Sequence, residues 1–204
     1  MRPLTLETPK PLLEVHGRTL LEHQISFLKN RVESIAVTVG YMSEKVAESA
    51  LQYGSDYIFK NNGGGNAGWL NSPILRGFQS QILIITCDNL MQVDLEGLES
   101  ETKATPHFSY LVTRESDVGV KGDRIIQSNG RIESISQQEN VALLATGLQV
   151  LNPGTLSQNA IFESFHDVWS DLIGNNSLFV SQNRPNRWTA IDTPLDLENA
   201  YVNW

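Results

Sequence analysis

The sequence predicts an α/β fold in which a mostly parallel sheet is flanked by helices, with a small antiparallel extension in the second half. Two observations support this prediction. Helix and strand patterns alternate through the first half of the chain, as they do in consecutive βαβ units. In the second half, strand patterns at 124–128 and 131–136 flank Asn129-Gly130, a dipeptide typical of a type I′ hairpin.

Hydrophobic periodicity defines the elements of the first half. It predicts helices at 18–30, 43–53 and 67–79, and strands at 34–39, 56–59 and 81–87. In the first helix, Leu21, Ile25 and Leu28 share one face. Ser43 can cap the second helix, whereas Pro73 conflicts with the third unless a first turn begins there.

The second half continues with strands and two helices. Its patterns predict strands at 107–114, 141–150 and 177–182, a helix at 159–173 and a closing helix from Pro194. Phe162, Phe165 and Trp169 share one helical face, which favours core packing over a ligand platform. Because no repeat, low-complexity segment or long linker divides the chain, we expect one domain over residues 1–204.

Composition excludes several classes of function. With 204 residues, of which 40% are hydrophobic, the chain can bury one sizeable core. A net charge of −8 argues against a nucleic-acid surface. The single cysteine, Cys87, excludes an internal disulfide and a thiolate zinc cluster, and favours a reducing cytoplasm. No long apolar run or signal peptide is present, so we expect a soluble cytoplasmic protein without a membrane partner.

Two other chemistries lack support in the sequence. The four histidines are scattered, and none has the i, i+4 helical spacing of a zinc site. No Gly-x-Ser-x-Gly elbow follows a strand, so hydrolase chemistry is not indicated.

Asp88 directly follows residues 81–87, a run so apolar that the strand is expected to be buried on both faces. In open α/β sheets, ligands bind beyond the carboxyl ends of the strands, and a carboxylate there is placed for a metal. The alternative is a helix-capping Asp. Because Asp94 is already placed to cap a helix at 95–98, Asp88 is the better candidate for function.

The first segment of the chain carries a lysine between two prolines. Residues 2–13 are too rich in proline for a helix, and the rigid surroundings of Lys10 suit a cation held in place. Composition alone favours a solvent-exposed lysine on a terminal arm.

A family resemblance changes this balance. Residues 3–12, Pro-Leu-Thr-Leu-Glu-Thr-Pro-Lys-Pro-Leu, and residues 15–24, Val-His-Gly-Arg-Thr-Leu-Leu-Glu-His-Gln, resemble the amino-terminal signature of the sugar-1-phosphate nucleotidyltransferases, or nucleoside-diphosphate-sugar pyrophosphorylases. The likeness continues in matching order through 39–41, 65–68, Asp88, 118–120, 146–147 and 191–196. It implies a Rossmann-like (GT-A-like) fold, and it implies that Lys10 contacts phosphate oxygens.

The resemblance also implies a nucleobase-reading loop. Gly65, Asn66 and Gly68 match the family loop in which the backbone approaches the base closely, where larger side chains would obstruct it. Taken alone, a Gly-rich loop of this kind is more often a flexible turn.

Three further positions are implied to contact the sugar. Gly119 and Gly147 resemble glycines at which the family brings its backbone to the sugar. Glu139 resembles the acid that contacts sugar hydroxyls, although Asn140 stands where the family has a basic residue.

Asp192 is the second candidate metal ligand. It precedes Thr193-Pro194, where an ordinary helix-capping role is also open. The family motif aligns in two ways, one of which places its acid at Ala190, whereas residues 191–196 match the other version. Asp88 and Asp192 would suffice for Mg²⁺, which needs only one or two carboxylates plus phosphate oxygens and waters.

The family signature opens with a buried strand and a Gly-rich loop ending in a catalytic Arg, all before the position of Met1. We therefore expect an N-terminally incomplete domain without the loop whose N–H groups wrap the nucleotide phosphates. Arg2 falls past that loop and cannot replace the Arg. This chain is accordingly expected to be impaired or inactive.

The predicted activity is transfer of a nucleoside monophosphate from a nucleoside triphosphate to a sugar 1-phosphate, with release of pyrophosphate. Lys10 and Asp88 are the predicted catalytic residues and Mg²⁺ the predicted cofactor. One alternative is a cytidylyltransferase for a non-sugar phosphate such as phosphocholine. Another is a non-catalytic relative that binds nucleotide. The sugar, the base and self-association into a homo-oligomer stay open.

Overall fold

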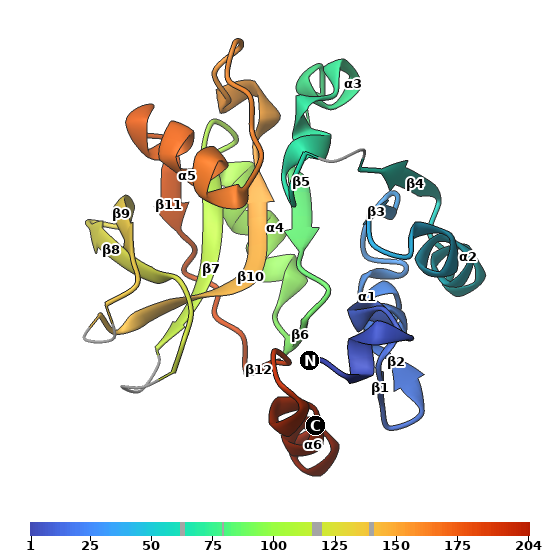
Figure 1. The fold of residues 1–204 in the computed structure, drawn as a ribbon. Coiled ribbons are helices and arrows are strands. Elements are labelled where there is room, and N and C mark those ends of the chain that lie inside the picture. The colour runs from blue at the N-terminus through green and yellow to red at the C-terminus, as the bar shows by residue number, and fades with distance from the viewer. Residues whose placement is uncertain (62–63, 79, 116–119, 139–140) are drawn as a thin grey trace. The chain divides into compact units, whose positions relative to one another are not determined.

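A computed structural model describes residues 1–61, 64–78, 80–115, 120–138 and 141–204 (Figure 1). The chain forms two compact units. Unit 1 is made of Met1–Gly63, Thr86–Met91 and Arg187–Trp204, and unit 2 of Gly64–Ile85 and Gln92–Asn186. Each unit combines segments that are far apart in the sequence. The expected single domain over 1–204, with a further strand before it, stays a prediction.

Unit 1 contains short strands and three helices. Its elements are η1 (Leu4–Leu6), η2 (Lys10–Leu12), β1 (Glu14–Val15), β2 (Arg18–Thr19), α1 (Leu20–Leu28), β3 (Ala36–Val39), α2 (Ser43–Tyr53), β4 (Tyr57–Lys60), β12 (Arg187–Ala190) and α6 (Pro194–Asn203). Strands β3 and β4 pair in parallel, β1 and β2 pair antiparallel, and β12 pairs with β6 (Asn89–Gln92).

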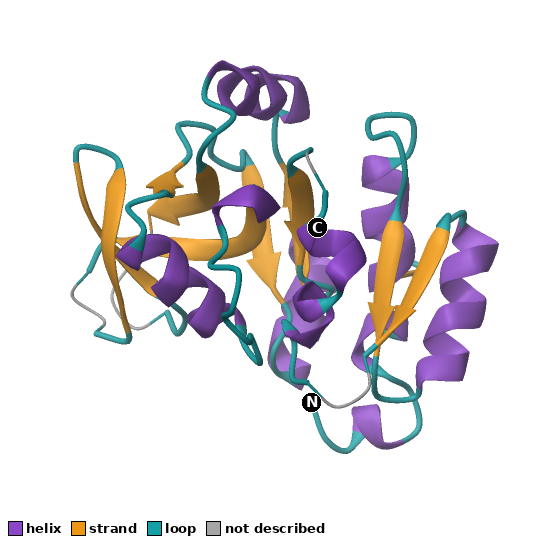
Figure 2. Cartoon of the chain, turned by 90° about the horizontal axis from the view of Figure 1, so that it is seen from above, coloured by secondary structure: helices purple, strands orange, loops and turns teal. Residues whose placement is uncertain are grey.

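Helices α1 and α2 lie beside the β3–β4 pair and share a core with it (Figure 2). The buried members of this core are Leu21, Ile25, Ile35, Val39, Val46 and Ala50. The predicted face of α1 is therefore largely confirmed, with Leu28 packed at its margin. A second, smaller core joins Val15, Leu20, Leu90, Ile191 and Ala200.

The prediction that Ser43 caps α2 is wrong. Ser43 is the first helical residue, and the cap position belongs to Met42, which adopts a left-handed conformation with φ of 49°. The helix therefore begins at Ser43, one residue earlier than a cap at Ser43 would predict. Helix α2 ends at Tyr53 and is followed by Gly54 with φ of 102°, a left-handed conformation that glycine adopts without a steric penalty.

Unit 2 is built on a six-stranded sheet. Its elements are η3 (Gly68–Asn71), α3 (Pro73–Arg76), β5 (Ile82–Ile85), α4 (Leu95–Ala104), β7 (Ser109–Glu115), β8 (Arg124–Ser128), β9 (Arg131–Ser136), β10 (Leu143–Leu151), η4 (Pro153–Thr155), α5 (Phe165–Gly174) and β11 (Leu178–Val180). The helix expected over 67–79 is in fact η3 followed by α3. Pro73 occupies the first turn of α3, where its missing N–H is tolerated.

The α/β class is confirmed, and the sheet is mixed. Its strand order is β5-β10-β7-β11-β9-β8. Strand β11 runs parallel to β7, but the long strand β10 runs antiparallel to β5, β7 and β8. Hydrogen-bonded pairs in this sheet are therefore mainly antiparallel, where the sequence predicts a mostly parallel sheet. The insertion of β10 between β5 and β7, which run in the same direction, accounts for the difference.

The antiparallel extension is the predicted hairpin of β8 and β9. Asn129 and Gly130 have φ of 52° and 81°, and a type I′ turn requires positive φ at both central residues. The Gly130 N–H donates to the Gln127 side-chain oxygen over 2.7 Å.

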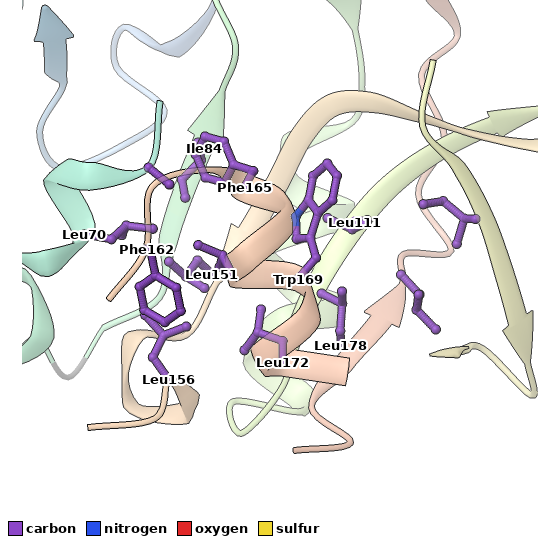
Figure 3. Packing of buried hydrophobic residues seen from close by; sticks show 14 residues of the cluster. Leu70, Ile84, Leu111, Leu151, Leu156, Phe162, Phe165, Trp169, Leu172 and Leu178 are labelled. Carbon is purple, nitrogen blue, oxygen red and sulfur yellow. The ribbon is translucent and has the colours of Figure 1, made fainter. Parts of the chain in front are cut away.

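One helix face organises the core of unit 2. Phe165, Trp169 and Leu172 of α5 point toward the sheet, and Phe162 packs beside them (Figure 3). The buried Trp169 indole donates to Gln149 Oε1 over 2.8 Å, which satisfies its N–H. The prediction that Phe162, Phe165 and Trp169 are core residues is confirmed.

Strand β5 is less buried than its composition predicts. Only Ile84 is fully buried, whereas Ile82, Leu83 and Ile85 are half-buried. In the part of the chain that is described, β5 has a single hydrogen-bonded neighbour, β10, because it stands at the end of the strand order. The expectation of burial on both faces is therefore wrong for these residues. No helix among the described residues is long and apolar enough to cross a membrane.

Candidate active site

Three charged side chains from three separate segments of unit 1 meet at one point. The Lys10 Nζ lies 3.1 Å from Asp88 Oδ2 and 2.7 Å from Asp192 Oδ1. The two carboxylates are 104 positions apart by number, and Lys10 lies on the first segment of the chain. The structure thus brings together all three residues that the sequence predicts for phosphate and metal chemistry.

The backbone around Lys10 is held by proline on both sides. Pro9 is extended, with φ of −63° and ψ of 145°, and Lys10 opens the short helix η2 with Pro11 in its first turn. The N–H groups of Leu12 and Leu13 donate to the carbonyls of Pro9 and Lys10. The Lys10 side chain is only 23% exposed and makes two ion pairs, so the alternative of a free lysine on a terminal arm is wrong.

Asp88 lies in the turn that joins β5 to β6. Its Oδ2 accepts from Lys10, and its Oδ1 accepts from the Asn89 amide over 2.8 Å. Its carbonyl accepts the Ile191 N–H over 2.8 Å, which links the turn to the residue preceding Asp192. Leu90 and Ile191 are both buried in the smaller core of unit 1, so apolar packing anchors the chain next to each acid.

Asp192 is not the cap of α6. The cap residue is Thr193, whose side chain accepts from the Asp196 N–H, and Asp196 in turn accepts from the N–H groups of Thr193 and Asp192. This reciprocal capping box leaves the Asp192 carboxylate available to Lys10. The capping role considered for Asp192 is therefore wrong. Ala190, the position that the other alignment assigns to the acid, lies in β12.

Two groups at this site have altered proton affinity. Burial lowers the pKa of Lys10, but its hydrogen bonds and attraction to Asp192 and Asp88 outweigh burial and raise that pKa above its ordinary value. Lys10 is therefore a cation at neutral pH. Burial, reinforced by the neighbouring Asp88 carboxylate, raises the pKa of the Cys87 thiol to about 12. Cys87 is consequently a neutral, weakly reactive thiol.

The site suits a small hard cation. Two carboxylate oxygens already converge on one positive group, the Lys10 ammonium, within 3.1 Å. Oxygen donors are the ligands that Mg²⁺ prefers, and one or two carboxylates are enough when phosphates and waters complete its shell. Among the described residues, no group of three or more His, Cys, Asp or Glu side chains forms a metal cage. The donor set therefore fits Mg²⁺ shared with a phosphate ligand.

The residues predicted for nucleobase binding lie in unit 2, beside the start of α5. Gly65 has φ of 59°, and a Cβ there would lie 2.0 Å from the Glu163 carbonyl oxygen. The Asn66 side chain accepts the Phe165 N–H over 3.2 Å, and the Ala67 N–H donates to Glu163 O over 3.1 Å. A local packing reason therefore exists for glycine at 65, in addition to any close approach to a base.

Gly68 opens η3, and Gly147 lies in β10 with φ of 80°. The register between β10 and β7 shifts between Ala145 and Gln149, so Gly147 occupies a bulge. Bulges are frequent next to binding sites because they redirect the backbone. The remaining predicted sugar contacts, Gly119 and Glu139, fall outside the described residues, as does Asn140.

Sequence reasoning assigned no role to two amides beside Asp88. Gln24 of α1 donates to the carbonyls of Thr86 and Asn89, and Asn89 donates to Thr86 Oγ1 and to Asp88. The sequence does contain one indication that the Gln24 side chain has a structural partner. Gln24 follows the fully buried Leu20 by four positions and so places an amide on an apolar helix face, where an amide must find hydrogen-bond partners.

Comparison with solved structures identifies the class of fold. A Bacillus anthracis protein assigned as a glucose-1-phosphate thymidylyltransferase matches with a TM-score of 0.80 and 19% identity, over 99% of this chain and 89% of that one. The CTP:phosphocholine cytidylyltransferase of Streptococcus pneumoniae matches with a TM-score of 0.72 and 19% identity, over 99% and 92% of the two chains. The chain therefore has the nucleotidyltransferase fold.

Sequence comparison adds the family relationship. The mannose-1-phosphate guanyltransferase of Pichia angusta is 25% identical over an alignment of 220 positions, which covers 96% of this chain and 58% of that protein. The choline-phosphate cytidylyltransferase of Streptococcus pneumoniae is 37% identical over 62 residues, 30% of this chain and 27% of that protein. The chain thus spans less than two thirds of these curated relatives. No protein-family model matches it. The chain is therefore similar to the sugar-1-phosphate nucleotidyltransferases, and the resemblance found in its motifs is confirmed.

Proposed function

We propose that this protein is a nucleotidyltransferase that joins a nucleoside monophosphate to a sugar 1-phosphate and makes a nucleoside diphosphate sugar. The observation that carries the proposal is the convergence of Asp88 and Asp192 on the Lys10 ammonium. A reaction between two polyanions requires positive charge at the reacting phosphates and carboxylates that can hold a metal there. Lys10 would meet the first requirement, and Asp88 and Asp192 would meet the second.

In the proposed reaction, an oxygen of the sugar phosphate attacks the α-phosphorus of the triphosphate in line. The new bond joins that oxygen to the α-phosphorus, and the bond from the α-phosphorus to the bridging oxygen of the β-phosphate breaks. Pyrophosphate leaves with the electron pair of that bond. No protein side chain becomes covalently bonded, so catalysis depends on alignment and charge neutralisation.

Each charged residue then has a specific task. Lys10 neutralises and orients the phosphate of the sugar substrate, since its raised pKa keeps it protonated. Asp88 and Asp192 would hold Mg²⁺ through their carboxylate oxygens. When bound, the metal supplies charge neutralisation across the phosphates of the triphosphate. Lys10, which contacts both carboxylates in this structure, would contact phosphate oxygens when substrate is bound.

Substrate selection is proposed to depend on the residues that the family resemblance implies. Gly65, Asn66 and Gly68 would present backbone groups to the nucleobase. The bulge at Gly147, together with Gly119 and Glu139, would contact the sugar. The free thiol of Cys87 supports a reducing cytoplasm as the place of this reaction.

One second candidate has a specific observation in its favour. The 37% identity to a choline-phosphate cytidylyltransferase over 62 residues favours a cytidylyltransferase that acts on a non-sugar phosphate. The catalytic roles of Lys10, Asp88 and Asp192 would be unchanged, because both reactions join a phosphate oxygen to the α-phosphorus. Only the acceptor phosphate and the nucleobase would differ.

Pyrophosphate release tests the proposal. The protein is incubated with Mg²⁺, each of four nucleoside triphosphates, and either a panel of sugar 1-phosphates or phosphocholine. We expect release with one triphosphate and a sugar 1-phosphate. Release only with CTP and phosphocholine would support the second candidate.

The same assay is run on a version extended by an upstream strand and Gly-rich loop taken from a relative. We expect faster release from the extended version, because that loop would add N–H donors to the triphosphate. If both versions are folded and neither releases pyrophosphate, the enzyme proposal fails. Nucleotide binding without turnover would then identify a non-catalytic relative.

A further inference from the structure

We propose that Gln24 is a positioning residue that, together with Asn89, fixes the carboxylate of Asp88 for cation binding. The inference rests on the proposed function, because it concerns the same metal site. It assigns a role in that site to a side chain of helix α1 that would contact neither the substrates nor the metal.

The geometry around Gln24 is that of a clamp on one turn. Its Nε2 donates to Thr86 O over 2.6 Å and to Asn89 O over 3.1 Å. These two carbonyls flank Cys87 and Asp88, the two central residues of the turn between β5 and β6. One amide group therefore holds both ends of the turn, 62 and 65 positions away in the sequence.

The clamp is itself rigid. Gln24 lies in the middle of α1, next to Ile25, which is 2% exposed. The helix is capped by Thr19, whose side chain accepts the Glu22 N–H. A side chain on a packed and capped helix loses little additional conformational freedom when it binds the turn. The hydrogen bonds of Gln24 therefore fix the turn relative to helix α1.

Asn89 extends the clamp to the carboxylate itself. Its Nδ2 donates to Asp88 Oδ1 over 2.8 Å and to Thr86 Oγ1 over 2.6 Å, and the residue is only 7% exposed. With Oδ1 engaged by Asn89, Oδ2 is the oxygen that faces the cation, as its contact with Lys10 demonstrates. Asp88 is thereby oriented to bind a metal through Oδ2.

The first test measures metal binding without substrates. Mn²⁺ is titrated into the protein and its affinity is read by electron paramagnetic resonance, since oxygen sites for Mg²⁺ also accept Mn²⁺. The substitution Gln24→Met keeps a side chain of similar volume and removes the Nε2 hydrogen-bond donor. We expect Mn²⁺ affinity to fall about tenfold, as is usual when a group that orients a metal ligand is lost.

Gln81→Met is the matched control. Gln81 also donates its amide to a backbone carbonyl, that of Phe108 over 3.2 Å, but it precedes β5, whereas the turn follows β5. Its replacement should leave Mn²⁺ affinity unchanged. Asn89→Ala is the second variant, and it should weaken Mn²⁺ while leaving the Gln24 amide in place. Thermal unfolding of every variant distinguishes loss of the fold from a displaced Asp88 carboxylate in a folded protein.

The second test does not require a metal. Cys87 is the single cysteine of the chain and a central residue of the clamped turn, so its rate of alkylation reports the opening of that turn. Gln24→Met should raise the alkylation rate several-fold at neutral pH, and Gln81→Met should not.

The outcomes separate the two proposals. If wild-type protein binds Mn²⁺ and Gln24→Met binds it equally well, the role of Gln24 is refuted while the metal site stands. A wild-type protein that binds no Mn²⁺ contradicts the metal site of the proposed function, and the positioning role falls with it. Weaker Mn²⁺ binding with faster Cys87 alkylation, confined to the Gln24 and Asn89 variants, supports the inference.

Discussion

The two units differ in the contacts that stabilise each of them internally. Among the described residues, 14 buried side chains of unit 2 form a core between its helices and its sheet. In unit 1, the described residues form two smaller cores of six and five buried residues. The smaller of these joins its three segments, together with polar contacts at Lys10, Asp88 and Gln24. The comparison teaches that a substitution in the unit 2 core should act on stability, whereas one at the unit 1 contacts should act on chemistry.

The largest expected effect tests the unit 2 side of this comparison. Phe162 is 1% exposed in the core, whereas its neighbour Ile161 is 79% exposed. Phe162→Ala should lower the free energy of unfolding by about 4 kcal/mol, because it removes apolar burial and leaves a cavity. Ile161→Ala should change it by less than about 0.5 kcal/mol. Urea denaturation measures both, and similar losses from the two variants would contradict the assignment of the core.

The next effect concerns chemistry in unit 1. Asp88→Asn keeps the shape of the side chain but removes the charge that faces Lys10. On an active form of the protein, pyrophosphate release should fall about a hundredfold or more, as expected for one electrostatic element. Asp94→Asn is the control. Asp94 caps α4, and asparagine caps equally well, so turnover should stay within about threefold. Turnover of Asp88→Asn within that same limit would refute its role.

A smaller effect compares one glycine in each unit. Gly65 and Gly17 have φ of 59° and 72°, but a Cβ at Gly65 would collide with the Glu163 carbonyl, whereas nothing lies within 4 Å at Gly17. Gly17→Ala should cost about 1 kcal/mol for its backbone conformation alone. Gly65→Ala should cost about 2 kcal/mol, because a close contact is added. Equal losses in thermal unfolding would show that packing against Glu163 does not restrict this loop.

Much of the fold was predictable because it depends on local signals. The helix at 43–53, the Asn129-Gly130 hairpin and the closing helix at Pro194 are encoded within a few residues of each element. The mixed sheet was not predictable in the same way. Where β10 pairs depends on contacts between residues far apart in the sequence, and a run as apolar as β5 does not reveal how many neighbours it has.

The residues of the candidate active site likewise differ in how far the sequence predicts them. Lys10, Asp88 and Asp192 were predictable from residue type and family resemblance, and the structure brings them together. The contribution of Gln24 was not, because its partners are backbone carbonyls, which leave no mark on the sequence. The resemblance could not supply the local reason for Gly65 either, since the Glu163 carbonyl that crowds it lies almost a hundred positions away.

The smallest expected effect returns to Lys10 and to the pH dependence of stability. The carboxylates raise the pKa of Lys10 in the folded protein above its ordinary value of 10.5. A group of this kind adds stability that is fully present below its unfolded pKa and is lost as pH rises through its folded pKa. Wild type should therefore exceed Lys10→Met in free energy of unfolding by a constant amount from pH 8 to about 10, and this difference should shrink above 10.5.

Lys103→Met serves as the control for this pH series, because its partner is the exposed Glu99 at 2.6 Å, four positions away on the same helix. An exposed pair contributes at most about 0.5 kcal/mol, so this variant should stay within that amount of wild type throughout. Chemical denaturation at each pH supplies the values. A difference between wild type and Lys10→Met that persists undiminished at high pH would mean that side-chain packing, and not the charge shared with Asp88 and Asp192, ties this lysine to unit 1.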